Sequence, residues 1–334
     1  MTRLRVAGVG AGYFSQFHLQ GWRAIPEVEL VGWCDRDVAR VKGVAAYGSV
    51  EEMIDNAKPD LVDIVTPPDT HRELVSATAA HGLPVICQKP LAPTYAEAVE
   101  VVERAERAGV PLIVHENFRW QPWYRAIKDV QVRGDIGDFT HIHFLMRMGD
   151  GWGEDAYLAR QPFFREYPRL LIYETGVHFI DTFRFLLGDV ATVVAETKQL
   201  NPAIRGEDAG QVLLKFRNGS TAIWDASRYN ESEAANPRFT FGELRIDGTR
   251  GHLTMDLSST IRVKRLGQPA VELDYPRERK NFAGDCVFFL QRHFVDCMVS
   301  GEEFESSGSD YLSNVRIVDA AYESARTGSS VRVA

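Results

Sequence analysis

Residues 4–22 read LRVAGVGAGYFSQFHLQGW and set the architecture of the first part of the chain. No polar residue stands between Arg5 and Gly12, which predicts a buried strand that ends in a glycine turn. Apolar and aromatic residues then follow at spacings of three and four as far as Ile25, a period that predicts a helix with one buried face. Pro26 ends this helix. The segment therefore has the order strand, glycine turn, helix.

The turn carries the spacing Gly10-x-Gly12-x-x-Ser15, which matches the dinucleotide-binding pattern except at its third glycine. Backbone at such a turn bends sharply and approaches a pyrophosphate where a Cβ would collide. The amides at the start of the following helix then face the phosphate charge. Ser15 is small enough to replace the third glycine, and its hydroxyl can add a phosphate contact. Tyr13 and Phe14 lie in the same loop and are expected to contact the cofactor as well.

An acidic residue follows the second expected strand, residues 28–34. Asp35 stands about twenty positions after Ser15, where a carboxylate accepts hydrogen bonds from the adenosine ribose and favours NAD. Arg36 is adjacent, and an arginine at this place can bind a 2′-phosphate. We therefore expect NAD as the cofactor, with NADP as the alternative.

Strands and helices alternate through residue 114. Capping boxes, which mark helix starts, occur at Ser49–Glu52, Thr70–Glu73 and Thr94–Glu97. Such alternation predicts an α/β fold in which a Rossmann-type, doubly wound parallel sheet has helices on both faces. We expect this dinucleotide-binding domain to span residues 1–120.

The pattern changes in residues 121–334, which we expect to form an α+β domain for substrate binding and oligomerisation. Apolar and polar residues alternate over 139–148, and Asn218-Gly219 between two strand-like runs is a strong hairpin signal. Further strands are expected at 238–246 and 252–256, around Asp247-Gly248. The result is a large, mostly antiparallel sheet. Two amphipathic helices are expected near the end of the sequence, at 285–300 and 309–327.

Composition narrows the class of protein. The chain has 334 residues, a net charge of −8 and 25% charged residues, which is typical of a globular protein and argues against nucleic-acid or anionic-membrane partners. Its four cysteines show no CxxC spacing, so we expect them to be reduced and mostly buried, as in a cytoplasmic protein. No run of residues is apolar and long enough for a signal peptide or a membrane span.

Two segments follow the ends of expected strands, the edge at which parallel sheets bind ligands. These are IVTPPDTHREL, residues 64–74, and VICQKPLAPTYAEA, residues 85–98. Lys89 directly follows a buried strand. A lysine before a proline is usually a solvated loop residue, but its place at this edge favours a functional role.

Over essentially its whole length the chain resembles the glucose–fructose oxidoreductase / inositol dehydrogenase / MocA family. The family motifs GxGxxGxxH, TPxxxH, EKPLA and DxGxHxxD correspond here to Gly10–His18, Thr66–His71, Gln88–Ala92 and Glu174–Asp181. The resemblance implies an NAD(P)-dependent dehydrogenase acting on a secondary alcohol of a sugar, a sugar derivative or a cyclitol. It also implies that Lys89, Glu174 and His178 form the catalytic set. Gln88 departs from the family's glutamate, and Glu174 from its aspartate.

Elementary chemistry agrees with these roles. An imidazole, with an ordinary pKa of about 6.5, suits His178 as the base that takes the hydroxyl proton. Lys89 can stabilise the developing negative charge on the same oxygen. Glu174 lies four residues before His178 and shares its face if the segment is helical, so it can orient the imidazole or bind a substrate hydroxyl. The same Glu-x-x-x-His spacing suits a zinc pair, but no third ligand motif is apparent, so no metal is expected.

The remaining site expectations concern cofactor and substrate contacts. The complete set expected to bind the cofactor is Gly10, Gly12, Tyr13, Phe14, Ser15, Asp35, Arg36, Thr66, Pro67, Pro68, His71, Gln88 and Lys89. Substrate contacts are expected from Arg and aromatic residues of two loops, namely Arg119, Trp120, Arg165, Arg169 and Tyr173. Two other functions stay open: a glycosidase that oxidises its substrate transiently with NAD, and a non-catalytic cofactor sensor. We expect a homodimer or homotetramer formed through the sheet of the second domain.

Overall fold

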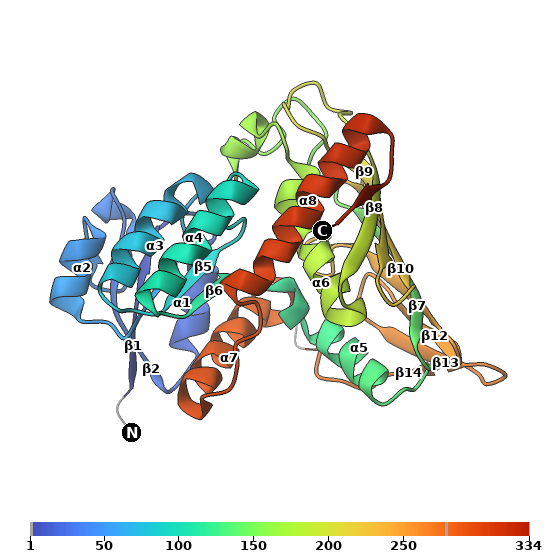
Figure 1. The fold of residues 1–334 in the computed structure, drawn as a ribbon, viewed down its shortest axis with the longest axis horizontal. Coiled ribbons are helices and arrows are strands. Elements are labelled where there is room, and N and C mark those ends of the chain that lie inside the picture. Colours follow the sequence, from blue (N-terminus) through green and yellow to red (C-terminus); the bar gives the residue numbers. More distant parts are fainter. Residues whose placement is uncertain (1–2, 278–279, 334) are drawn as a thin grey trace. The chain divides into compact units, whose positions relative to one another are not determined.

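The computed structural model describes residues 3–277 and 280–333 (Figure 1). The chain forms two compact units. The first contains the residues up to Asn117 together with Cys286–Val315, and the second contains Phe118–Asp285 and the residues from Arg316 onward. The sequence analysis divides the chain once, after residue 120. It does not include the return of 286–315 to the first unit.

A six-stranded parallel sheet forms the centre of the first unit, in the order β3-β2-β1-β4-β5-β6. This is the order of a Rossmann fold, and it reverses between β1 and β4, where such sheets bind dinucleotides. The strands are β1 Leu4–Val9, β2 Val28–Cys34, β3 Ala46–Tyr47, β4 Leu61–Ile64, β5 Val85–Gln88 and β6 Leu112–His115. The predicted doubly wound sheet is confirmed.

Helices cover this sheet, and α2, α3 and α4 lie side by side in Figure 1. Apolar side chains of α1 and α7, among them Trp22 and Phe294, pack in one core cluster with Val6 and Ile86 of the sheet. Gly21 of α1 allows close packing, because a Cβ there would collide with Gln291 of α7. The helices are α1 Ser15–Arg23, α2 Val50–Ala57, α3 His71–Ala80, α4 Tyr95–Ala108 and α7 Cys286–Ser300.

Two of the three predicted capping boxes begin helices. The hydroxyls of Ser49 and Thr94 accept hydrogen bonds from the amides of Glu52 and Glu97, at 3.1 and 3.2 Å. The prediction at Thr70 is wrong. Its backbone is already helical, because a 3-10 turn, Pro68–Thr70, leads directly into α3, and its hydroxyl bonds within that loop.

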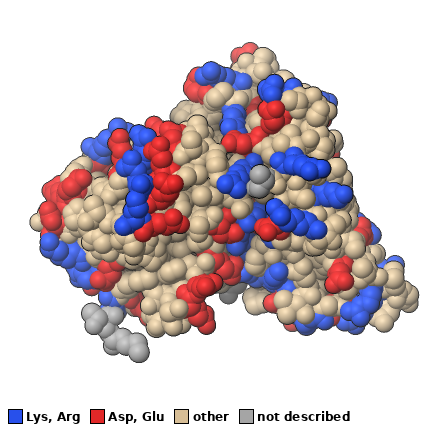
Figure 2. All heavy atoms as spheres, viewed as in Figure 1, with Lys and Arg blue, Asp and Glu red and all other residues tan. Residues whose placement is uncertain are grey.

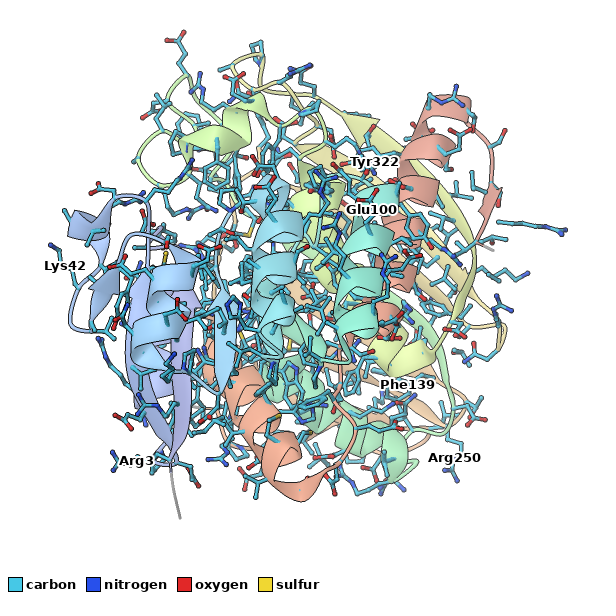
Figure 3. All side chains as sticks on the ribbon, turned by 60° about the vertical axis from the view of Figure 1, so that its left-hand side comes forward. Arg3, Lys42, Glu100, Phe139, Arg250 and Tyr322 are labelled. Carbon is cyan, nitrogen blue, oxygen red and sulfur yellow. The ribbon has the colours of Figure 1, made fainter. Side chains whose placement is uncertain are left out.

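On the face of the first unit visible in Figure 2, basic and acidic side chains alternate over the helices. Glu100 of α4, labelled in Figure 3, forms ion pairs with Arg72 at 3.4 Å and with Arg104 at 3.9 Å. Such exposed pairs contribute little stability. They give this face mixed charge instead of a basic patch.

The second unit is built on a nine-stranded sheet in the order β14-β13-β12-β11-β7-β10-β9-β8-β15. All its neighbouring strands are antiparallel except β7 and β10, which run parallel, so the predicted mostly antiparallel sheet is confirmed. The strands are β7 Phe139–Arg147, β8 Val190–Lys198, β9 Ala209–Phe216, β10 Thr221–Ser227, β11 Glu243–Gly248, β12 Gly251–Met255, β13 Ile261–Arg265, β14 Val271–Glu272 and β15 Val331–Arg332.

One face of this sheet carries a helical layer. Phe179 of α6 packs on Phe144 and Trp224 of the sheet, with ring centroids 4.4 and 5.4 Å apart. The opposite face keeps Val194 and Leu213 exposed. The helices are α5 Pro122–Val132, α6 Val177–Leu187 and α8 Gly308–Thr327, the last of which contains the third crossing of the chain between the units.

The hairpin at Asn218-Gly219 forms as predicted. The strand expected over 238–246 begins only at Glu243, because Phe241 adopts φ +63° and Gly242 φ +155°, which breaks the extended backbone. Gly248 pairs with Gly251, so the turn lies between these two residues and not at Asp247-Gly248 as predicted.

All four cysteines are free and buried, as predicted. Burial raises the pKa of the Cys34 thiol to about 11 and that of Cys87 well above its usual value, so both are poor nucleophiles. Among the described residues, no helix is both long and apolar enough to cross a membrane.

Candidate active site

The loops at the carboxyl ends of β1, β2, β4 and β5 carry the predicted cofactor-binding residues and Lys89, all within the first unit. Gly10 has φ +98°, and a Cβ there would lie 2.5 Å from the carbonyl oxygen of Val65. Any other residue would therefore push the β1 loop away from the end of β4. This glycine is needed by the fold itself.

Gly12 differs from Gly10. A Cβ at Gly12 would meet no atom of the described residues within 4 Å, apart from its chain neighbours. The space above this backbone is therefore open, as expected where a pyrophosphate approaches the chain. Ser15 is buried and donates its hydroxyl hydrogen to the Gly12 carbonyl at 2.7 Å, which holds the loop in this shape. These features fit a bound dinucleotide.

Asp35 braces the same loop from the end of β2. One carboxylate oxygen accepts a hydrogen bond from the Ala11 amide at 2.7 Å, and the other accepts one from the Asp37 amide at 2.9 Å. Each oxygen has a further lone pair, so the half-buried carboxylate can still accept a ribose hydroxyl. Arg36 beside it is exposed. The geometry fits the expectation that Asp35 favours NAD.

His71 ties the loop after β4 to the loop after β5. Its buried ring has Nε2 2.9 Å from the carbonyl oxygen of Thr66 and Nδ1 3.0 Å from that of Leu91. Burial lowers the pKa of His71, although both carbonyls favour the charged ring. These contacts fix the backbone of the half-buried Thr66 and the exposed Pro67 beside the sheet edge.

The pKa shift of His71 predicts acid-sensitive stability. Above about pH 6.5 the ring is neutral in both states, whereas below it the unfolded chain takes up a proton that the folded chain does not. The free energy of unfolding should therefore fall by up to about 1.4 kcal/mol per pH unit below that point. Urea unfolding of wild type and His71→Gln at several pH values tests this. The variant should have a shallower slope, exposed His81→Gln should keep the wild-type slope, and equal slopes in all three proteins would contradict the assignment.

Gln88 and Lys89 follow β5. The side-chain oxygen of Gln88 accepts a hydrogen bond from the Lys89 amide at 2.8 Å, and its nitrogen lies 3.0 Å from Nε2 of His18. Lys89 is half-buried, and its bond to Pro90 is cis. His18 ends the glycine motif and has no further role assigned to it from the sequence. The structure places it within the network behind Lys89.

The other predicted catalytic residues, Glu174 and His178, belong to the second unit and lie before and at the start of α6. His178 is 6% exposed, and its ring stacks on that of Phe118, with centroids 3.9 Å apart and an interplanar angle of 5°. Phe241, the residue with positive φ, packs beside this stack, with its ring centroid 4.7 Å from that of Phe118. The aromatic stack fixes the plane of the imidazole.

Glu174 lies in a π-helical turn, Leu171–Gly176, so the four-residue spacing to His178 is not that of a regular α-helix. Its carboxylate accepts hydrogen bonds from Thr175, at 2.7 Å, and from Arg228, at 3.2 Å. The buried Arg228 also pairs with Asp150 at 2.6 Å. Burial alone would raise the pKa of Asp150, but Arg228 and Arg160 outweigh it and hold that pKa below its usual value. Glu174 is thus part of a partly buried ionic cluster around Arg228.

Two family descriptions match the chain: "Oxidoreductase family, NAD-binding Rossmann fold" over residues 4–116 and "GFO/IDH/MocA C-terminal domain" over residues 124–254. The chain is also 37% identical over 348 residues to D-apiose dehydrogenase of Rhizobium rhizogenes, a match that covers 100% of this chain and 98% of that enzyme. The chain belongs to the Gfo/Idh/MocA oxidoreductase family.

Other members show the same similarity along the chain. Inositol 2-dehydrogenase 2 of Saccharopolyspora erythraea is 27% identical, with 99% of this chain and 95% of that one covered. A crystal structure of an oxidoreductase from Agrobacterium radiobacter, in complex with NAD⁺, L-tartaric acid and magnesium, has 35% identity and a TM-score of 0.91, covering 99% of each chain. The protein is therefore an NAD-binding oxidoreductase that acts on CH–OH donors.

Several residues predicted to bind substrate have protein partners in this family member. Arg119 is buried and forms two hydrogen bonds with Asp181, at 2.7 and 2.6 Å. The guanidinium of Arg125 lies 3.5 Å from the ring centroid of buried Trp120. These contacts are those of core residues. Whether Arg119 and Trp120 also touch substrate stays a prediction.

The other predicted substrate residues lie in or near the loop before the π-turn. Arg165 donates to the carbonyl of Glu154 at 2.7 Å and therefore braces the loop. Arg169 pairs with Asp319 at 2.6 Å, and its guanidinium lies 4.1 Å from the ring centroid of Tyr322. Tyr173 donates its backbone amide to the Tyr322 hydroxyl at 3.1 Å.

The sequence analysis missed the residues that shape this turn. Glu207 accepts hydrogen bonds from the amides of Leu170 and Ile172, at 3.2 and 3.1 Å, and from the hydroxyl of Tyr322, which Figure 3 labels on α8. Glu207 and Arg228 carry no motif and lie 33 and 54 residues after Glu174. No local pattern in the sequence could have identified them.

Proposed function

We propose that this enzyme oxidises a secondary hydroxyl of a sugar or cyclitol with NAD, and that D-apiose is the first substrate to test. The observation that carries the proposal is the position of Lys89. A hydrogen-bonded network holds this residue at the same sheet edge as the Gly10–Gly12 loop. A lysine placed there can stabilise negative charge on a reacting oxygen, which a non-catalytic cofactor sensor does not require. The similarity to D-apiose dehydrogenase supports the choice of first substrate.

We assign the cofactor contacts to the loops of the first unit. The open backbone at Gly12 and the amides at the start of α1 would bind the pyrophosphate, and Asp35 would accept the ribose hydroxyls. The loop of Thr66, Pro67 and Pro68 borders the same edge. NAD supplies the hydride acceptor when bound.

The catalytic roles are divided between two side chains. His178 removes the proton of the substrate hydroxyl, because a neutral imidazole is a competent base near neutral pH. Lys89 donates a hydrogen bond to the same oxygen and stabilises its developing charge. Glu174 is held by Arg228 and Thr175 and acts as a positioning residue at the start of α6.

The test is an assay of purified protein with NAD and a panel of sugars and cyclitols that includes D-apiose and myo-inositol. We expect NADH formation with at least one of them, in proportion to substrate oxidised. Hydrolysis of a glycoside without NADH release would favour the glycosidase instead. Binding of NAD with no turnover on any polyol would favour a sensor. Either of these results would overturn the proposal.

We also propose a homodimer or homotetramer in the cytoplasm. Val194, Leu213 and Ile223 are in register on three neighbouring strands and give the open sheet face an apolar stripe suited to a second copy of the chain. Leu213→Lys should yield monomers by light scattering, whereas Leu266→Lys, on an exposed hairpin, should not. A monomeric wild type would contradict this. The buried, free cysteines suit a reducing compartment.

A further inference from the structure

A buried polar chain runs behind Lys89 inside the first unit. Asp63 of β4 accepts hydrogen bonds through one carboxylate oxygen from Nε1 of Trp22, at 2.6 Å, and from Nδ1 of His18, at 2.7 Å. Nε2 of His18 meets the side-chain nitrogen of Gln88 at 3.0 Å, and the Gln88 oxygen meets the Lys89 amide at 2.8 Å. Asp63, His18 and Trp22 have no exposed surface, and Gln88 has 8%.

The donors and acceptors of this chain allow one assignment of protons. The Lys89 amide can only donate, so the Gln88 oxygen must face it and the Gln88 NH₂ must face His18. Nε2 of His18 must then accept, which makes His18 neutral with its proton on Nδ1. That proton is donated to Asp63. The contacts between His18, Gln88 and Lys89 are therefore satisfied by a neutral imidazole and an amide at position 88.

We propose that Gln88 is the positioning residue of Lys89, and that neutral His18, oriented by Asp63, sets which way the Gln88 amide points. The catalytic importance of Lys89 rests on the proposed function. The placement of Lys89 by Gln88 does not. A protonated His18 would donate from Nε2, so Gln88 would have to turn its oxygen away from the Lys89 amide. The orientation of one buried amide thus links His18 to the backbone of Lys89.

A carboxylate at position 88, as in the family signature, requires a different proton count. It can still accept from the Lys89 amide, but it cannot donate to Nε2 of His18. The ring of His18 carries one proton between the Asp63 carboxylate and the Gln88 amide, whereas between two carboxylates it would carry two. The groups that face the ring are Asp63, Gln88, His115, whose ring centroid lies 4.1 Å away, and Phe14, at 5.6 Å.

The experiment compares wild type with Gln88→Glu and Gln88→Met, and uses exposed Gln20→Glu as a matched control for the charge change. Nitrogen-15 labelling of histidine reports which ring nitrogens of His18 carry protons. Nitrogen-15 labelling of lysine reports the hydrogen exchange of the Lys89 amide. Steady-state kinetics with the substrate found in the panel separates kcat from KM, and NAD affinity is measured by titration.

In wild type and in Gln20→Glu we expect His18 protonated at Nδ1 only and a protected Lys89 amide. Gln88→Glu should protonate both ring nitrogens at neutral pH and keep the Lys89 amide protected. Gln88→Met should speed Lys89 exchange by about tenfold or more and lower kcat by about tenfold, because one hydrogen bond is lost. Recovery of kcat in Gln88→Glu would show that the bond to Lys89 is the relevant one.

The proposal fails if wild-type His18 carries its proton on Nε2 or on both nitrogens, or if Lys89 exchange is equal in wild type and Gln88→Met. Neither result depends on the catalytic role of Lys89. Conversely, unchanged turnover in Lys89→Ala would end the proposed function and leave the placement of Lys89 by Gln88 standing. The two failures are therefore distinguishable.

Discussion

Lys89→Ala is expected to bind NAD normally and to lose turnover by at least about 100-fold, the low end for acid–base and charge-stabilising groups. The substrate oxygen gains negative charge as its proton leaves, and the ammonium of Lys89 is the positive group that the loop after β5 brings to the sheet edge. Alanine removes this charge without altering the glycine loop or Asp35. The loss should therefore appear in kcat and not in the affinity for NAD.

The matched control is Lys42→Ala, an exposed lysine of the same unit that is labelled in Figure 3. It should retain wild-type kinetics and NAD binding. Near-normal turnover in Lys89→Ala would refute the assigned role. A variant that no longer binds NAD would instead place Lys89 in cofactor binding alone.

His178→Ala is expected to lose turnover by a similar factor of at least about 100, again with NAD binding retained. Its imidazole is the base in the proposed reaction, and its plane is fixed by the stack on Phe118. The pH–rate profile gives a second readout. Wild-type kcat/KM should fall on the acid side as the base is protonated, whereas the residual activity of the variant should lack that acid limb.

His81→Ala, on an exposed position at the end of α3, is the matched control and should keep both the rate and the acid limb. Retention of the acid limb in His178→Ala would show that another group is the base. A loss of folding, checked by circular dichroism, would call for His178→Asn in its place, with the same expected loss of turnover.

The first unit was predictable because its signals are local. The glycine turn and the caps at Ser49 and Thr94 each act over a few residues, and Asp35 is marked by its place directly after β2, so pattern and structure agree. Thr70 shows the limit of this reasoning, because a capping box needs an extended residue before the helix and Pro67-Pro68 start a 3-10 turn instead.

The surroundings of Glu174 and His178 were less predictable because their geometry depends on partners that are distant in sequence. His178 carries a motif, but Glu207 and Arg228, which shape the turn holding Glu174, do not. The return of α7 to the first unit has the same cause. It depends on close packing of Gln291 against Gly21, which no periodicity reveals.

The network behind Lys89 was only partly predictable from the sequence. Gln88 and His18 both stand in recognisable motifs, and the sequence shows that Gln88 departs from the family's glutamate. Only the structure brings them together, because the bond between their side chains joins positions 70 residues apart. Counting hydrogen-bond donors and acceptors in the structure then shows what a glutamine at position 88 changes relative to the family's glutamate.

The central claim is that Lys89 and His178 act on the same substrate hydroxyl, and a double-mutant cycle tests it most directly. kcat/KM is measured for wild type, Lys89→Ala, His178→Ala and the double variant. Groups that act together at one transition state are strongly non-additive. We predict that the double variant loses little more than the more damaged single variant. A loss equal to the product of the two single losses would contradict the account.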